Sequence, residues 1–304
     1  MEHPLSEEDV EGFVRNGYVM LKGAFSRDAA AAARKFLWAR LEEDGIAASS
    51  PRTWPVRHGI AECYDSADDT VWTDVLTPRL YNAIAQLCGP GRVGKFACGW
   101  WVVTFPSVSE APWAVEGRWH VDGHTYRHFP DSRETGLIPI FLFNDIGPGD
   151  GGTALSTGSH IEVGKILWRQ AKDGLDCGAL SRRARQVLND SDTIEVNGEA
   201  GDVMLMHPFM VHARSRNLGR FGCDSVRFMC HPQVPLLKPM NVGKLGDSIS
   251  RNELESSFTP VEEAIVCSRR LIEEEDAIGF ASFGSKRMRD NCSEQRCSKR
   301  EREN

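Results

Sequence analysis

Residues 117–124 read Gly-Arg-Trp-His-Val-Asp-Gly-His, and no other stretch of the chain says more about its fold and chemistry. Side chains alternate between the two faces of a strand, so His120 and Asp122 are expected on the same face. Gly123 follows at once and indicates a turn. The stretch therefore predicts an imidazole and a carboxylate side by side at the end of a strand.

A second histidine from a distant strand would complete a metal site, and residues 207–212 (His-Pro-Phe-Met-Val-His) offer two candidates. His207 and His212 are five positions apart and would face opposite sides of one extended run. Pro208 begins a new local conformation and leaves His212 at the end of an apolar run, so His212 is favoured over His207. Two imidazoles and one carboxylate leave the opposite face of a metal open, as in non-haem Fe(II) oxygenases.

Short runs of β-branched and aromatic residues extend on both sides of these histidines, separated by Gly, Pro and Asp. The runs are residues 96–105, 137–144, 193–196, 203–207 and 226–231. Such a pattern favours antiparallel strands in a sandwich or barrel, for example a jelly roll. We therefore expect a β core over about residues 91–235.

Helices are predicted before and after this core. Ser6 precedes three acidic residues and should cap a helix that ends near Gly17, and Ser26 should cap an Ala-rich helix that runs to about Leu41. A strand is expected between them at residues 18–21, and further helices at 181–188 and 260–276. This organisation predicts one domain over residues 1–284, with helical parts at 1–90 and 236–284. The basic tail at 285–304 is expected to be disordered.

The composition of the chain indicates which classes of binding partner to expect. The 304 residues carry a net charge of -7, which does not favour a broad nucleic-acid-binding surface. No apolar run is long enough to cross a bilayer. The nine cysteines are scattered without a Cys-x-x-Cys pair, which indicates a reducing compartment. We expect a cytoplasmic protein that acts on a small molecule, without nucleic-acid or membrane partners.

Four arginines follow His212 within fifteen positions: Arg214, Arg216, Arg220 and Arg227. A guanidinium that faces into a barrel can pair with both oxygens of a carboxylate. Arg227 lies in the strand-like run Ser-Val-Arg-Phe-Met-Cys, whereas the other three lie in a loop containing Gly and Asn. Arg227 is therefore the favoured anchor for a remote carboxylate.

Four pieces of the sequence resemble, in their order and spacing, the phytanoyl-CoA dioxygenase-like branch of the Fe(II)/2-oxoglutarate oxygenases. They are residues 13–19 (FVRNGYV), 119–122 (WHVD), 151–153 with 158–160 (GGT and GSH), and 201–203 (GDV) leading to His212 and Arg227. The resemblance covers residues 6 to about 235. It implies a double-stranded β-helix, a jelly-roll and cupin-like core of mainly β character, with flanking N-terminal and C-terminal helices.

The same resemblance assigns roles to residues. His120, Asp122 and His212 would hold Fe(II), and Arg227 would bind the distal carboxylate of 2-oxoglutarate. The family often has a serine two places after the distal histidine, where this chain has Arg214, so Ser215 is the candidate for that role.

Two further residues depend on the family pattern. The spacing from His212 to Arg227 is longer than usual, which leaves Arg220 open as an alternative anchor. Trp101 falls near a family position that lines the 2-oxoglutarate site.

The implied reaction couples O2 and the decarboxylation of 2-oxoglutarate, which gives succinate and CO2, to hydroxylation of an unidentified small molecule, with ascorbate in support. Halogenating relatives replace the carboxylate ligand with a small residue, so Asp122 favours hydroxylation. Two alternatives stay open: a cupin-like metalloenzyme that does not use 2-oxoglutarate, and a non-catalytic jelly-roll protein that binds a ligand.

Overall fold

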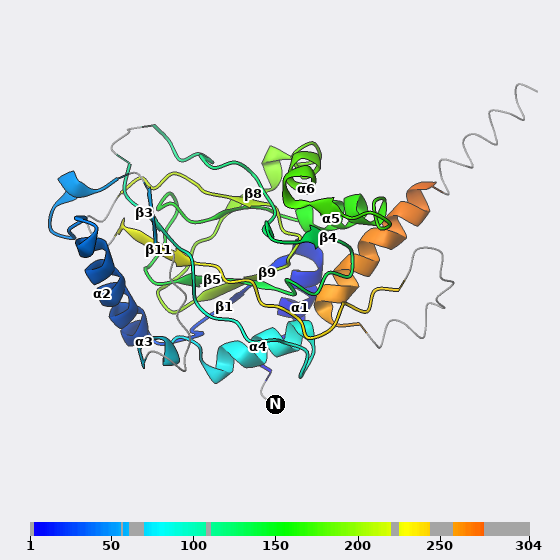
Figure 1. Cartoon of the computed structure of the whole chain (residues 1–304), viewed down its shortest axis with the longest axis horizontal. Coiled ribbons are helices and arrows are strands. Elements are labelled where there is room, and N and C mark those ends of the chain that lie inside the picture. The colour runs from blue at the N-terminus through cyan, green and yellow to red at the C-terminus, as the bar shows by residue number, and fades with distance from the viewer. Residues whose placement is uncertain are drawn as a thin grey trace, which may run out of the picture.

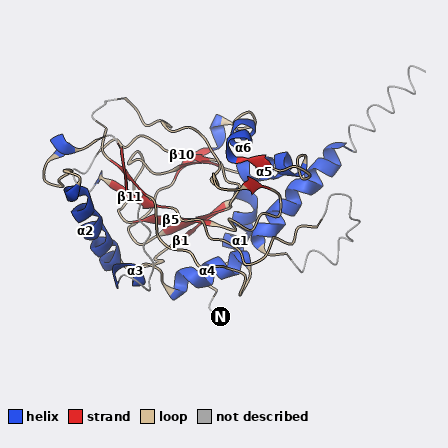
Figure 2. Cartoon of the chain, in the orientation of Figure 1, coloured by secondary structure: helices blue, strands red, loops and turns tan. Residues whose placement is uncertain are grey.

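The computed structural model consists mainly of antiparallel sheets surrounded by helices (Figure 1; Figure 2). The strands gather in the middle of the molecule and the helices lie around them. This arrangement confirms the predicted jelly-roll core with flanking helices. The residues that the structure describes are 3–55, 57–60, 70–107, 111–219, 225–243 and 258–276.

The larger sheet has six strands in the order β1-β9-β5-β11-β3-β2, and every neighbouring pair is antiparallel. Its strands are β1 (Tyr18–Leu21), β9 (Val203–Met206), β5 (Ile138–Leu142), β11 (Arg227–Cys230), β3 (Trp101–Thr104) and β2 (Arg57–Ile60). Neighbours in the sheet are far apart in the chain, so the sheet brings distant segments to one surface.

Two smaller sheets complete the β structure. The three-stranded sheet contains β10 (His212–Ala213), β6 (Ala154–Ser156) and β8 (Thr193–Glu195), with β6 in the middle. The two-stranded sheet pairs β4 (Arg127–His128) with β7 (Leu175–Asp176).

The helices lie along the sides and one end of the sheets. They are α1 (Glu7–Asn16), α2 (Arg27–Glu43), η1 (Pro51–Thr53), α3 (Thr70–Thr73), α4 (Pro78–Cys88), α5 (Ser159–Trp168), α6 (Cys177–Ala184), η2 (Asp190–Asp192) and the C-terminal helix at 260–276. In Figure 1, α2 lies to the left of the strands and α4 below them, and α5, α6 and the C-terminal helix gather at the right.

The ends of α1 follow the sequence signals. The Ser6 hydroxyl accepts a hydrogen bond from the Asp9 backbone N–H, and the Asp9 carboxylate accepts one from the Ser6 N–H. Gly17 ends the helix with φ 85°, and a Cβ there would lie 2.3 Å from the methyl group of Met210. Glycine is therefore required at this position both by backbone conformation and by space.

Side-chain alternation along the strands divides the interior into two cores. Val103 and Phe228 lie on one face of the larger sheet and pack in the core that includes Leu37 of α2. Val102 and Met229 lie on the other face and pack in the core that includes Leu155 of β6. The second core therefore joins the two larger sheets, and alternate residues of β3 and β11 face the space between them.

Some predicted bounds are wrong. The helix predicted at 181–188 is α6, which begins at Cys177 because the carboxylate of Asp176 accepts a hydrogen bond from the Ala179 N–H. The run at 96–105 forms a strand only over Trp101–Thr104. The helix capped by Ser26 continues to Glu43 rather than Leu41.

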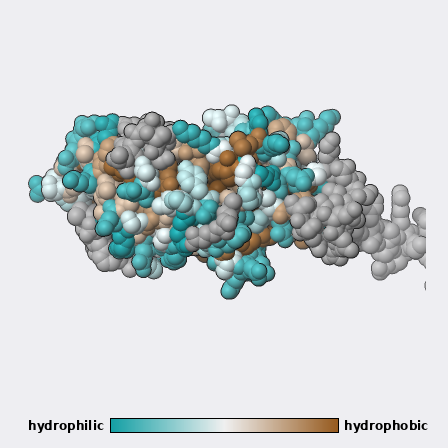
Figure 3. All heavy atoms as spheres, turned by 90° about the horizontal axis from the view of Figure 1, so that it is seen from below, coloured by the Kyte–Doolittle hydropathy of each residue, from teal (hydrophilic) through white to brown (hydrophobic). Residues whose placement is uncertain are grey.

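On the face shown in Figure 3, hydrophilic side chains are widespread and apolar ones gather in smaller patches between them. Among the described residues, no helix combines the length and apolar character needed to cross a bilayer. The predicted basic tail at 285–304 lies outside the described residues.

Candidate metal centre and its cavity

Backbone pairing brings the two histidines of the predicted site together. The His120 N–H donates to the His212 carbonyl and the His212 N–H donates to the His120 carbonyl, both at 3.0 Å. Directly opposed residues of an antiparallel pair share a face. The centroids of the two imidazole rings are accordingly 4.3 Å apart.

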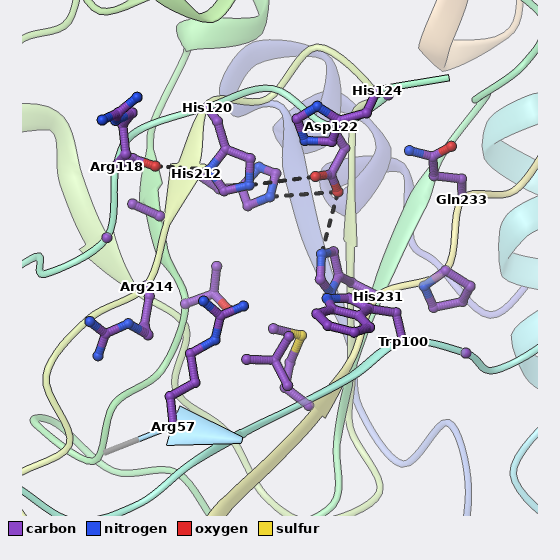
Figure 4. Close-up of a pocket in the computed structure, with 18 of the residues that line it drawn as sticks. Arg57, Trp100, Arg118, His120, Asp122, His124, His212, Arg214, His231 and Gln233 are labelled. Atoms are coloured by element: carbon purple, nitrogen blue, oxygen red, sulfur yellow. Dashed lines mark hydrogen bonds and ion pairs between the residues drawn. The ribbon is translucent and has the colours of Figure 1, made fainter. Parts of the chain in front are cut away.

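Asp122 completes the group (Figure 4). Its Oδ1 lies 3.5 Å from His120 Nε2, and its Oδ2 lies 3.6 Å from His212 Nε2. One donor atom from each of the three residues lies within 4.8 Å of the others, close enough to hold a metal ion. The structure thus brings together the three residues predicted as ligands.

Hydrogen bonds set both imidazoles in the form that binds metals. The carbonyl of Arg118 accepts from His120 Nδ1 at 2.9 Å, and the carbonyl of Met210 accepts from His212 Nδ1 at 3.2 Å. A carbonyl only accepts, so Nδ1 carries the proton and Nε2 presents a lone pair. His212 Nε2 is buried and has no hydrogen-bond partner among the described residues, as expected of an atom placed to bind a metal.

The charges at the site favour a cation. Burial lowers the pKa of His212 to about 4, so this ligand is neutral at pH 7. Burial raises the pKa of Asp122, but the surrounding histidines outweigh it and hold the pKa well below its ordinary range. Burial also lowers the pKa of His120, which the hydrogen bond and charge of Asp122 bring back above its ordinary value. An ionised carboxylate beside two imidazoles is a suitable donor set for Fe(II).

Helix α6 supports the segment that carries two of the ligands. The Val121 N–H donates to Ser181 Oγ at 3.1 Å, and the Val121 carbonyl accepts from Cys177 Sγ at 3.1 Å. The backbone between His120 and Asp122 is therefore fixed from the side opposite the ligands.

Arg227 is a buried cation in the same cavity. It lies on β11, 2% exposed, and donates from Nη1 to Thr153 Oγ1 at 3.1 Å and from Nη2 to Thr104 Oγ1 at 3.3 Å. Burial lowers its pKa to about 10, so it stays charged at neutral pH. Its Nε has no hydrogen-bond partner and it forms no ion pair among the described residues, although the charge of Glu195 is near enough to raise its pKa. A buried charge without a direct ion pair is costly, so this site is suited to an anion.

Two residues predicted at the 2-oxoglutarate site lie elsewhere. Trp101 is fully buried on the outer face of β3, with its ring 4.6 Å from that of Trp72, and does not line the cavity. Alternation along β3 explains this, because Val102 takes the inner face. Ser215 donates to the Gly152 carbonyl at 2.6 Å and thereby supports the segment leading to Thr153.

Of the two alternative site residues left open by the sequence, His207 and Arg220, the structure places only the first. His207 is buried away from the three ligands: its Nε2 bonds to the Val261 carbonyl at 3.2 Å and its Nδ1 accepts from the Phe209 N–H. Arg220 lies outside the described residues.

The cavity, of about 830 Å³, also contains side chains that sequence reasoning missed. His231 Nε2 lies 3.5 Å from Asp122 Oδ2. Arg57 and Trp100 also line the cavity (Figure 4). Alternation from Arg227 through Met229 to His231 was a signal for His231, because all three should share a face. No such signal existed for Arg57, because 40 residues separate β2 from β3 in the chain.

Two comparisons with known proteins found matches. The model of the phytanoyl-CoA dioxygenase family matches residues 13–221. Three solved structures are similar: the 2-oxoglutarate-dependent carbocyclase SnoK and epimerase SnoN from nogalamycin biosynthesis, and iron-bound EctD from S. alaskensis. Their sequence identities are 21%, 18% and 19%, with TM-scores of 0.49, 0.50 and 0.48. The matches cover 76%, 75% and 76% of this chain and 84%, 80% and 78% of the respective structures. No curated protein matches the chain.

Proposed function

The chain belongs to the phytanoyl-CoA dioxygenase family, and from this membership we propose that it is an Fe(II)- and 2-oxoglutarate-dependent dioxygenase that hydroxylates a small molecule. One observation carries the proposal: a three-residue metal site and a buried guanidinium that forms no ion pair among the described residues share one cavity. A metal-chelating keto acid with a second carboxylate is suited to both.

His120, Asp122 and His212 would hold the iron on one face and leave the other face free. Bound there, Fe(II) supplies the O2-dependent oxidation of 2-oxoglutarate to succinate and CO2 that drives hydroxylation. The hydrogen bonds from Nδ1 to backbone carbonyls keep both imidazoles in the ligating tautomer.

Arg227 and Thr153 would bind the distal carboxylate. Both line the cavity, and the hydrogen bond between them fixes their relative orientation. The guanidinium is held on a strand and needs no rearrangement to present its donors, which lowers the entropic cost of binding. Thr153 takes the hydroxyl role that the family pattern suggested for Ser215.

Asp122 supports hydroxylation over halogenation, because the carboxylate occupies the position that halogenating relatives leave to a small residue. His231 favours a second candidate, a cupin-like metalloenzyme without 2-oxoglutarate, because it adds a third imidazole 3.5 Å from Asp122. An experiment must therefore measure 2-oxoglutarate use directly.

The test is succinate formation from 2-oxoglutarate with Fe(II), ascorbate and O2, since uncoupled turnover does not require the prime substrate. We expect succinate from wild type and from the control Asp131→Ala, an exposed acid outside the cavity. Asp122→Ala should form at least roughly 100-fold less, because even outer-shell changes cost 10- to 100-fold at metal sites. Folded, iron-loaded wild type that neither forms succinate nor binds 2-oxoglutarate would contradict the proposal.

A further inference from the structure

Arg57 lies level with Arg227, the proposed anchor of 2-oxoglutarate, on the larger sheet. Thr104 is the register partner of Arg227 on one side and of Arg57 on the other. Directly opposed residues of neighbouring strands share a face, so all three side chains lie on the side of the cavity. Figure 4 shows the Arg57 guanidinium directed into the hollow, toward the metal-binding side chains.

The charges lining the cavity are unbalanced. Four arginines face a single carboxylate among the described lining residues: Arg57, Arg118, Arg214 and Arg227 against Asp122. An Fe(II) ion and a 2-oxoglutarate dianion would cancel each other, so they would leave the excess positive charge in place. The whole chain carries a net charge of -7, which makes this local excess a feature of the cavity.

Three of the four arginines are engaged elsewhere or point away from the metal-binding side chains. Arg227 is the proposed partner of the distal carboxylate of 2-oxoglutarate. Arg214 pairs with Glu116 at 2.8 Å. Arg118 is directed away from the ligands in Figure 4.

Arg57 remains as an exposed cation that no carboxylate of the described residues pairs with. It has no ion pair or side-chain hydrogen bond among the described residues, and it lines the same cavity as His120 and Arg227. A single planar guanidinium matches one carboxylate, with two parallel hydrogen bonds. A phosphate dianion would call for more cations than this one.

An aromatic surface lies beside this cation. Trp100 is 49% exposed and lines the cavity, and it has φ 41°, which is unusual for a residue other than glycine. Its ring lies against Gly59, where a Cβ would be only 2.8 Å away. Arg57 and Gly59 share a face of β2, so the strand places a charged donor and an indole ring side by side. Val102, Ala97 and Met229 add apolar surface to the lining.

We propose that the prime substrate is a small carboxylic acid with an apolar or aromatic body, whose carboxylate binds Arg57 and whose body packs on Trp100. This inference rests on the proposed function, because it takes the metal site and Arg227 as already engaged by iron and 2-oxoglutarate. Arg57 then sets the substrate class, and the distance between Arg57 and the metal selects which carbon lies near the iron.

The experiment uses three pairs of probes that differ only in charge: benzoate and benzamide, phenylacetate and phenylacetamide, and 1-naphthylacetate and 1-naphthylacetamide. Each is titrated calorimetrically into protein loaded with Fe(II) and 2-oxoglutarate in the absence of O2. For at least one pair, wild type should bind the acid roughly tenfold or more tightly than the amide, as expected for hydrogen bonds to a charged group.

Three variants assign the effect. Arg57→Gln should remove the preference for the acid and leave the affinity for the amide unchanged. Arg52→Gln, an exposed arginine in η1 outside the cavity, should behave as wild type. Trp100→Ala should lower the affinities for the acid and for the amide by similar factors, because both probes lose contact with the indole ring.

Three results would overturn the inference. One is wild type that binds none of the acids more tightly than its amide, whether both bind or neither does. Another is an Arg57→Gln variant that still binds the acids more tightly than the amides. A variant that loses affinity for 2-oxoglutarate instead of for the probes would also overturn it, because that result would place Arg57 in the cosubstrate site. Failure of wild type to bind 2-oxoglutarate in the first place is a different outcome, and it would count against the proposed function itself.

Discussion

Arg227 carries a positive charge into the protein interior and forms no ion pair among the described residues, and its proposed binding of a ligand carboxylate explains why. Replacing a buried charge with an apolar side chain of similar volume is often neutral or stabilising. The residue is thus expected to contribute to ligand binding at the expense of stability, as active-site residues commonly do.

Arg227→Met should therefore separate binding from stability. We expect the Kd for 2-oxoglutarate to rise at least about tenfold, because hydrogen bonds to a charged group contribute ~1.5–3 kcal/mol. The melting temperature of the ligand-free variant should equal or exceed that of wild type. Calorimetric titration and differential scanning calorimetry measure the two quantities. If Arg220→Met weakens 2-oxoglutarate and Arg227→Met does not, the anchor is Arg220.

His231 lies beside the ligand carboxylate rather than within the group of three, and we expect it to orient Asp122. His231→Gln should weaken Fe(II) binding roughly tenfold, the usual effect of removing an outer-shell partner. The affinity of the iron-saturated variant for 2-oxoglutarate should stay unchanged. A loss as large as that of His120→Ala would instead make His231 a direct ligand and favour the cupin-like candidate.

At this scale, sequence reasoning found the residues whose spacing has a geometric meaning. His120 and Asp122 are two apart on an extended segment, and Arg227 lies within a strand. It misplaced Trp101 because a shift of one position on a strand moves a side chain to the other face. It missed Arg57 because strand order, which the sequence does not reveal, places β2 next to β3.

At the scale of elements, two buried histidines hold three helices together. His160 of α5 donates from Nε2 to the Val14 carbonyl of α1 at 3.0 Å, and the Nε2 of His207 bonds to the Val261 carbonyl of the C-terminal helix. The two rings lie 5.1 Å apart. Burial lowers the pKa of His160 to about 4 and that of His207 well below its ordinary value. Both are therefore neutral in the folded protein at pH 7.

The sign of the resulting pH dependence follows from these shifts. The unfolded chain takes up a proton near the ordinary histidine pKa of 6.5, whereas folded His160 does so only near 4. The contribution of neutral His160 to the free energy of unfolding is therefore complete above pH 6.5. It is lost as the pH falls toward 4, by about 3 kcal/mol in total. Below that pH both states are protonated and this contribution no longer changes.

His160→Gln should flatten this dependence, since an amide can still donate to the Val14 carbonyl but does not titrate. Urea unfolding at pH 7.5 and 5.0 measures the dependence. Between the two pH values, the free energy of unfolding of wild type should fall by about 2 kcal/mol more than that of the variant. Arg15→Gln, an exposed change on α1, serves as the control. Parallel losses in wild type and His160→Gln would mean that His160 does not titrate in this range.

Element ends were predictable where a side chain caps the backbone, and less so where tertiary contacts decide. Ser6 and Ser26 cap α1 and α2 as the sequence indicated. The helix near Ser181 was placed four residues too late because the capping role of Asp176 was not recognised. Strand lengths were overestimated because pairing partners, which end β3 at Thr104, are not visible in the local pattern.

At the scale of the whole molecule, the cavity joins the two larger sheets. Arg227 and Thr104 belong to the six-stranded sheet, and His212 belongs to the three-stranded one. The jelly-roll class was predictable from short alternating runs and from the family resemblance. The order of strands was not, because it depends on pairings between residues more than a hundred positions apart, such as Arg227 and Thr104.

A ligand that contacts both sheets should stabilise the entire domain, and the gain should require the metal and the cosubstrate together. At 100-fold excess over Kd, a ligand that binds only the folded state adds about 2.7 kcal/mol, which corresponds to roughly 5–10 °C in Tm for a domain of this size. Differential scanning calorimetry without O2 should show this shift with Fe(II) plus 2-oxoglutarate and a much smaller one with 2-oxoglutarate alone. Asp122→Ala should abolish the shift, because it removes a ligand, whereas Arg57→Gln should retain it, because Arg57 is reserved for the prime substrate. A full shift from 2-oxoglutarate without metal, or an undiminished one in Asp122→Ala, would show that the keto acid binds independently of the three ligands.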